Sequence, residues 1–193
     1  IGLCVVKITE EGFLKVKKVG GVSAHCSFMN RVIFRNGIVG TVAAYAKPEE
    51  FKSGDIDKLY IDIGAGSKEE AEQYVHVGDC AMFEGPYQEL VGRNVMAKAF
   101  DDRSACHIQI EALKAMKTPY HDVYFVFTVQ EEVGLFGATT SSERIQPDLG
   151  IAVDITGSFD VPGDEHGNVV LGKGAAICVS NACVICDEAM VEQ

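Results

Sequence analysis

The feature that most constrains the fold is an apolar run that ends in two acids. Residues 123–129 read V-Y-F-V-F-T-V and are followed by Gln130, Glu131 and Glu132, and then by two glycines. A continuous run of this kind is typical of a strand that is buried on both faces. Carboxylates are rarely buried unless they are paired or bind a metal. Glu131 and Glu132 therefore either mark the point where a strand reaches water or belong to a functional site at the end of that strand.

The part of the chain after Gly92 alternates between helical and strand patterns. The expected elements are a helix over 103–117, buried strands at 123–129, 149–153 and 175–179, a helix over 135–144, and a helix that begins near Asp187. Apolar strands separated by helices predict an α/β fold, with a mixed sheet that carries helices on both faces.

The part before about residue 90 has a different pattern and predicts a small β-rich domain. Two hairpins are expected, one formed by 3–8 and 13–19 and the other by 31–35 and 38–45 around Asn36-Gly37. Ser67 begins a capping box and predicts a short helix that ends near Tyr74. Further strands are expected at 59–63 and 80–83.

Composition excludes several kinds of partner. The chain has 193 residues and a net charge of −11, which argues against binding to nucleic acid or to an anionic membrane surface. No apolar run approaches the roughly 18 residues that a membrane span needs. Seven cysteines, mostly in apolar runs, indicate reduced and buried thiols in a cytoplasmic protein. The spacing of Cys178, Cys183 and Cys186 also resembles part of an iron–sulfur pattern, which remains the alternative to buried thiols for these three.

Acids follow the expected elements at three places. Asp101 and Asp102 precede the helix at 103–117, Glu131 and Glu132 end one strand, and Asp154 ends the next. Ligands of open α/β sheets bind outside the carboxyl ends of the strands, and carboxylates gathered there repel one another unless a cation lies between them. Each acid alone has a structural explanation, because Asp101, Asp102 or Ser104 can serve as a helix cap. Three acidic sites at one sheet edge favour a pair of divalent metals.

Adjacent Glu131 and Glu132 suit two different roles. Neighbouring residues of an extended segment point to opposite sides, so one can bind a metal while the other acts as a general base.

The motifs around these acids resemble metallopeptidase family 42, whose members are dinuclear-metal aminopeptidases. The matching segments are K-A-F-D-D-R at 98–103, T-V-Q-E-E-V-G at 128–134, V-D-I-T at 153–156 and D-V-P-G at 160–163. The resemblance implies a phosphorylase/hydrolase-like α/β catalytic domain, present incompletely at 91–193. It also implies a β-rich oligomerisation domain at 20–90 and the end of a first catalytic segment at 1–19. Relatives form tetrahedral dodecamers, which implies a homo-oligomer.

The resemblance also implies a role for each acid. Asp101 is similar to the carboxylate that bridges two metals in the family. The resemblance also implies that the peptide bond between Asp101 and Asp102 is cis. Glu132 is similar to a ligand of one metal, and Asp154 is similar to a ligand of the other. Glu131 is similar to the general base that activates the water between the metals. The metals would be two divalent ions, zinc or cobalt, with manganese as a further candidate. The substrates would be short peptides that lose their N-terminal residues.

Two histidine ligands of the family have no counterpart in this sequence. One belongs to a His-x-Asp segment expected just before Ile1, and the other to a segment expected beyond Gln193. The resemblance therefore implies a member cut at both ends. Among the five histidines present, none matches, although His166 follows Asp154 in the same loop. The expectation is that this chain alone binds metal weakly and has little peptidase activity.

Two other functions remain open. One is a non-catalytic, oligomerising chain with a broken metal site. The other, ranked below it, is an endoglucanase-type glycoside hydrolase, a label that some relatives of the family carry. Adjacent glutamates do not naturally give two carboxyls on either side of one sugar bond.

Overall fold

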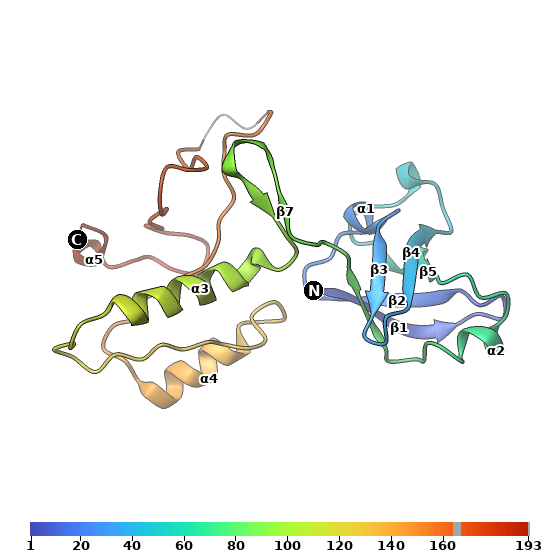
Figure 1. Cartoon of the computed structure of the whole chain (residues 1–193), viewed down its shortest axis with the longest axis horizontal. Coiled ribbons are helices and arrows are strands. Elements are labelled where there is room, and N and C mark those ends of the chain that lie inside the picture. Colours follow the sequence, from blue (N-terminus) through green and yellow to red (C-terminus); the bar gives the residue numbers. More distant parts are fainter. Residues whose placement is uncertain (164–166, 193) are drawn as a thin grey trace.

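The computed structural model describes residues 1–163 and 167–192. Its first part is a closed barrel of antiparallel strands in the order β1-β2-β5-β4-β3-β6 (Figure 1). The strands are β1 (Gly2–Ile8), β2 (Leu14–Val19), β3 (Arg31–Phe34), β4 (Val39–Ala44), β5 (Leu59–Asp62) and β6 (Cys80–Phe83).

The barrel encloses the hydrophobic core. In β2 the apolar residues Leu14 and Val16 point inward and alternate with Lys15 and Lys17, as the two-residue period of a strand requires. Side chains from every strand fill the interior, and they include Leu3, Val5, Leu14, Val16, Val32, Phe34, Val42, Leu59, Ile61 and Ala81.

The predicted hairpins are confirmed. β1 pairs with β2, and β3 pairs with β4. Gly37 has a φ of +90°, and Asn36 Oδ1 accepts a hydrogen bond of 3.1 Å from the Ile38 N–H. These two residues therefore form the turn that the Asn-Gly pair predicts.

Short helices and turns connect the strands of the barrel. Ser67 caps α2 by accepting a 3.3 Å hydrogen bond from the Glu70 N–H, although the helix is shorter than expected. The connecting elements are α1 (Ala24–Ser27), η1 (Pro48–Glu50), η2 (Ile56–Lys58) and α2 (Lys68–Ala71). Because β1 and β2 pair with β5 and β6, strands from 1–19 and from 20–90 share one sheet. The functional division into domains at these boundaries stays a prediction.

The described residues of the second part of the chain combine three α-helices with long irregular segments and form a separate lobe (Figure 1). The helices at 103–117 and 135–144 are confirmed, as is a short helix beginning after Asp187. A small hairpin, β7 with β8, was not expected from the sequence. The elements are β7 (Gln88–Glu89), η3 (Val91–Arg93), β8 (Val95–Met96), α3 (Phe100–Ala115), α4 (Phe136–Ile145) and α5 (Glu188–Val191).

The three buried strands predicted at 123–129, 149–153 and 175–179 are wrong for the structure. These segments have no strand assignment, and most of their apolar side chains are exposed, as with Val129 at 68% and Ile151 at 75%. A strand exists only where a neighbour completes its hydrogen bonds. In the described part of the chain the sheets are the barrel and the β7–β8 hairpin, and neither pairs with these segments. The mixed sheet with helices on both faces is therefore not formed among the described residues.

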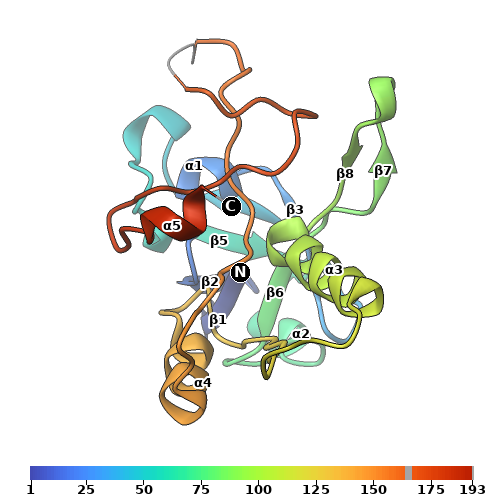
Figure 2. The ribbon, with the colours of Figure 1, turned by 90° about the vertical axis from the view of Figure 1, so that its left-hand side faces the viewer.

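For the described residues after α4, Figures 1 and 2 show a long irregular trace that carries α5 near its end. Within residues 1–163 and 167–192, no helix has the length and apolar character needed to cross a membrane.

Candidate metal centre

Asp101 and Asp102 lie in the first turn of α3. The residue before the helix, Ala99, has a φ of +63°, and both aspartates have non-helical backbone angles. The Asp101–Asp102 peptide bond is cis, as the family resemblance implies. The Ala105 N–H donates a 3.3 Å hydrogen bond to Asp102 Oδ1. Of the three candidate caps, Asp102 therefore takes this role, and the carboxylate of exposed Asp101 does not.

Glu131 and Glu132 lie in a tight turn before α4. The Gly134 and Leu135 N–H groups both donate to the Glu131 carbonyl oxygen at 3.0 Å, and the Gly137 N–H donates to the Val129 carbonyl oxygen at 3.0 Å. A Cβ on Gly137 would collide with the backbone of Val129, so glycine is required for this close approach. The glycines of the G-L-F-G segment therefore fix the path of the two glutamates.

The Glu132 backbone also lies against the barrel. A Cβ placed on Gly20 would be 3.4 Å from the Glu132 carbonyl oxygen and 3.2 Å from Ile1 Cγ1. Gly20 itself has a φ of +77°. The turn after β2 thus approaches the acidic loop.

Asp154 follows the segment at 149–153 and is exposed. Its Oδ1 accepts a hydrogen bond of 2.6 Å from the Ile155 N–H. This local contact holds the carboxylate at the end of its segment.

The acids of these three segments come close enough to repel one another. The pKa of the Glu131 carboxyl is raised, first by partial loss of its water, although the residue as a whole is exposed. The further causes, in order, are the charges of Glu132, Asp154, Asp101 and Asp102. Because acids at 101–102 and at 154 both act on Glu131, these two segments lie near the turn that carries it.

Asp102 is affected by the same convergence. Its pKa is raised first by burial and then by the charge of Asp154, while the hydrogen bond from Ala105 lowers it and Asp101 raises it. Asp154 thus acts on acids of both other segments. In the sequence, Asp102 stands out only as a neighbour of Asp101 or as a helix cap, because its membership in the cluster depends on the approach of Asp154.

The donor chemistry of this cluster fits divalent cations, because carboxylate oxygens are ligands for magnesium, manganese and zinc. The assembly is nevertheless open. Within the described ranges, no three Asp, Glu, His or Cys side chains are close enough to hold one ion. The carboxylates repel one another but do not form a finished coordination shell. His166, considered as a neighbour of the site, lies outside the described residues.

The sequence profile of the M42 glutamyl aminopeptidase family matches residues 1–193. This chain belongs to the M42 family. Among curated relatives, a putative aminopeptidase of Acetivibrio thermocellus is 46% identical over 96% of this chain and 56% of its own length. The lysyl aminopeptidase of Pyrococcus furiosus is 34% identical over 93% of this chain and 55% of its own length.

Two solved structures are similar to most of this chain. An aminopeptidase from Desulfurococcus kamchatkensis is 40% identical, with a TM-score of 0.75 over 84% of this chain and 46% of its own. An endoglucanase from Thermotoga maritima is 35% identical, with a TM-score of 0.66 over 83% of this chain and 47% of its own. The coarse prediction of a chain that combines a sheet with helices is confirmed. The chain spans about half the length of the curated relatives that it matches.

Proposed function

We propose that this M42 chain carries acids of the active site of a metal-dependent aminopeptidase, which removes N-terminal residues from short peptides. The observation that carries the proposal is the convergence of Asp101, Glu131 and Asp154. Such a cluster of like charges is relieved by bound cations. The proposed reaction, hydrolysis of the first peptide bond, is taken from the relatives, which are named aminopeptidases.

The acids would divide the work as follows. Asp101 would bridge two divalent ions, zinc, cobalt or manganese, while Glu132 and Asp154 would each hold one. These ions would polarise the scissile carbonyl and lower the pKa of water. Glu131 would hold the proton that water loses and pass it to the leaving amine. Partial loss of water and the charges of the neighbouring acids raise its pKa, the direction that makes a carboxylate a better proton acceptor.

The substrate class follows from the same charges. A peptide with a free α-amine carries a positive charge at its first residue, and the cluster around Glu131 is negative. Attraction between the two would place the first peptide bond near the metals. Relatives named for glutamyl and lysyl substrates suggest that side-chain preference lies outside this cluster.

Cobalt binding tests the ligand roles. Co²⁺ is titrated into this chain and into D101N, and its visible absorption is followed. Because each metal has few carboxylate ligands here, we expect weak binding by the wild type, and D101N should weaken it by about tenfold or more. The matched control is E143Q, a change at an exposed acid of α4 that is not among the acids acting on Glu131, and it should bind within about twofold of the wild type. Equal binding by D101N and the wild type would remove Asp101 from the site.

Hydrolysis tests the role of Glu131. Release of leucine, glutamate or lysine from chromogenic amides is measured with added Co²⁺ or Zn²⁺, for this chain and for the product of its complete reading frame. E131Q should lower kcat by about 10²–10⁴-fold, the usual contribution of a general base. An E131Q variant as active as the wild type would overturn the assignment.

Two alternatives have specific support. The open arrangement of the described acids favours a non-catalytic chain that contributes to an assembly. The similarity to a solved structure that is named an endoglucanase favours a glycoside hydrolase. Light scattering that detects an assembly, without metal-stimulated amide hydrolysis, would support the first, and hydrolysis of soluble cellulose would support the second.

We also propose that the chain takes part in a homo-oligomer. One solved neighbour is described as a dodecamer, and another as assembling into a tetrahedron or a large octahedral shell. Sedimentation of the purified chain tests this. Its cytoplasmic location stays a prediction that fractionation of the source cells would test.

A further inference from the structure

Two cysteines face each other where the barrel closes. Cys4 of β1 is directly opposite Cys80 of β6, in a pairing that otherwise joins Leu3 to Ala81. The sequence suggested buried thiols, but Cys80 is exposed and Cys4 is half-buried, and both are free. This expectation fails because both cysteines follow the outward face of their strands, on which Val6 and Met82 are also exposed.

The backbone hydrogen bonds show that Cys4 and Cys80 occupy a non-hydrogen-bonded position of the antiparallel pair, where the two strands come closest. Beside it, the Val5 N–H donates to the Asp79 carbonyl oxygen at 2.9 Å, and the Gly78 N–H donates to the Val5 carbonyl oxygen at 2.8 Å. Hydrogen-bonded and non-hydrogen-bonded pairs alternate, so Cys4 and Cys80 form a non-hydrogen-bonded pair, with Cα atoms typically about 4.5 Å apart. Disulfides form at Cα separations of about 4.4–6.8 Å.

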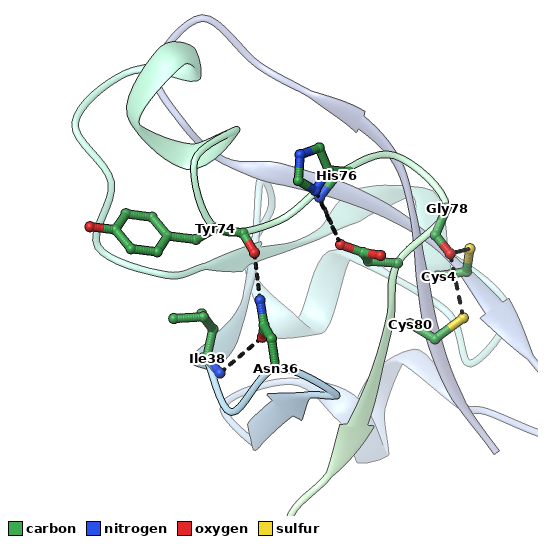
Figure 3. A network of polar contacts seen from close by, with 8 residues as sticks. Cys4, Asn36, Ile38, Tyr74, His76, Gly78 and Cys80 are labelled. Carbon is green, nitrogen blue, oxygen red and sulfur yellow. Dashed lines mark hydrogen bonds and ion pairs between the residues drawn. The ribbon is translucent and has the colours of Figure 1, made fainter.

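The two sulfur atoms also converge on one atom. Cys4 Sγ lies 3.6 Å and Cys80 Sγ lies 3.9 Å from the Gly78 carbonyl oxygen, as Figure 3 shows. The turn that carries this carbonyl is fixed, because the His76 N–H donates to Asp79 Oδ2 at 2.8 Å. The dithiol is therefore held in place by the barrel and by a structured turn.

The two thiols differ in access. Cys80 lines an open groove of about 540 Å³ together with Arg35, Asn36 and Asp79. Burial raises the pKa of the Cys4 thiol, and the Cys80 thiol and the Asp79 charge raise it further. A reagent in solution therefore meets Cys80 first, while Cys4 is the slower and more protected partner.

We propose that Cys4 and Cys80 form a redox-active dithiol that exchanges with low-molecular-weight disulfides. The Cys80 thiolate attacks one sulfur of the reagent, its S–S bond breaks, and one thiolate leaves as a mixed disulfide forms on Cys80. The Cys4 thiolate then attacks the Cys80 sulfur and displaces the second thiolate. The two protein protons go to the two released thiols, so the protein is oxidised by two electrons and the reagent is reduced by two. The resulting bond locks β1 to β6.

The test treats the full chain with oxidised glutathione at neutral pH and maps its disulfides by peptide mass spectrometry. The expected result is a linked pair of peptides that contain Cys4 and Cys80, formed at least about tenfold faster than any pair that includes Cys26. Exposed Cys26 is the matched control, and Cys26→Ser should leave the link unchanged.

Two variants separate the steps. Cys4→Ser should accumulate a stable glutathione adduct on Cys80, and Cys80→Ser should react with glutathione at position 4 at least about tenfold more slowly. Mapping of the wild type decides the question even if a variant does not fold. A lasting adduct on wild-type Cys80 without a link to Cys4, or links of both residues to other cysteines at equal rates, would overturn the proposal.

Discussion

Gly20 connects the barrel with the acidic loop through a few atoms. Its φ of +77° lies in the left-handed region, and a Cβ there would contact Ile1 and approach the Glu132 carbonyl oxygen. We expect Gly20→Ala to lower the free energy of unfolding by about 1–2 kcal/mol, the cost of this backbone region for a residue with a Cβ. Urea denaturation measures the change.

The neighbouring glycine is the control for this prediction. A Cβ on Gly21 would have no atom within 4 Å, and the φ of Gly21 lies outside the left-handed region. Gly21→Ala should therefore change the free energy of unfolding by less than about 0.5 kcal/mol. Equal effects of the two substitutions would mean that Gly20 is not held in the conformation described.

Asp55 gives the barrel an acid-sensitive contact. Its Oδ2 lies 2.9 Å from Lys58 Nζ and accepts a 2.9 Å hydrogen bond from the Lys52 N–H. The pKa of Asp55 is lowered from 3.8, first by the Lys58 hydrogen bond and then by the Lys52 backbone. A lowered folded pKa means that the contact stabilises the fold fully above the unfolded pKa. This contribution is lost as the pH falls through the folded value.

The corresponding prediction compares Asp55→Asn with the wild type over pH. The wild type should be the more stable at pH 7, and the difference should shrink steadily below the usual pKa of 3.8. Thermal unfolding at several pH values measures both. A difference that grows in acid would contradict the assigned direction.

At the scale of residues, the sequence predicted which acids gather but not how each is used. The residue types and their places, before a predicted helix for Asp101 and at the ends of predicted strands for Glu131 and Asp154, were enough to single these acids out. The cap could not be assigned in advance, because Asp101, Asp102 and Ser104 all offer a suitable oxygen. The choice of Asp102 depends on backbone angles at 101 and 102 that no local pattern encodes.

At the scale of elements, hairpins and helices were predicted well and three strands were not. Hairpins and helices are local, since Asn36-Gly37 or a Ser67 cap lies within a few residues of the contact that it makes. The runs at 123–129, 149–153 and 175–179 have strand composition, but a strand also needs a partner that is distant in sequence. Such a partner is not among the described residues, so composition alone gave the wrong result.

A pair of leucines tests this difference between elements. Leu59 of β5 is 0% exposed, whereas Leu149 is 56% exposed. We expect Leu59→Ala to cost about 2–5 kcal/mol of unfolding free energy and Leu149→Ala to cost less than about 0.5 kcal/mol. Urea denaturation of both variants provides the measurement. A large cost at Leu149 would show that its segment is buried in solution and would restore the predicted strand.

At the scale of the whole molecule, the buried core is concentrated in one part of the chain. Among the described residues, all buried hydrophobic side chains except one lie between Leu3 and Ala81. The exception is Ala105 of α3. Amides that exchange slowly with solvent are those whose opening requires unfolding of a packed core. The two lobes in Figure 1 should therefore differ in hydrogen exchange.

Hydrogen exchange followed by mass spectrometry tests this expectation. Peptides from β1, β2 and β5 should be protected at least about 100-fold more than peptides from residues 146–163. Comparable protection in both regions would show that the second lobe has a core of its own in solution.

Closure of the barrel also limits how it can meet other molecules. An open sheet presents free N–H and C=O groups that accept almost any extended strand, whatever its side chains. In the ring from β1 to β6 every strand pairs with a neighbour on each side, which leaves few such groups free. Recognition by this lobe must therefore be encoded in side chains and loops, where single substitutions can change a partner gradually without opening the fold to indiscriminate strand addition.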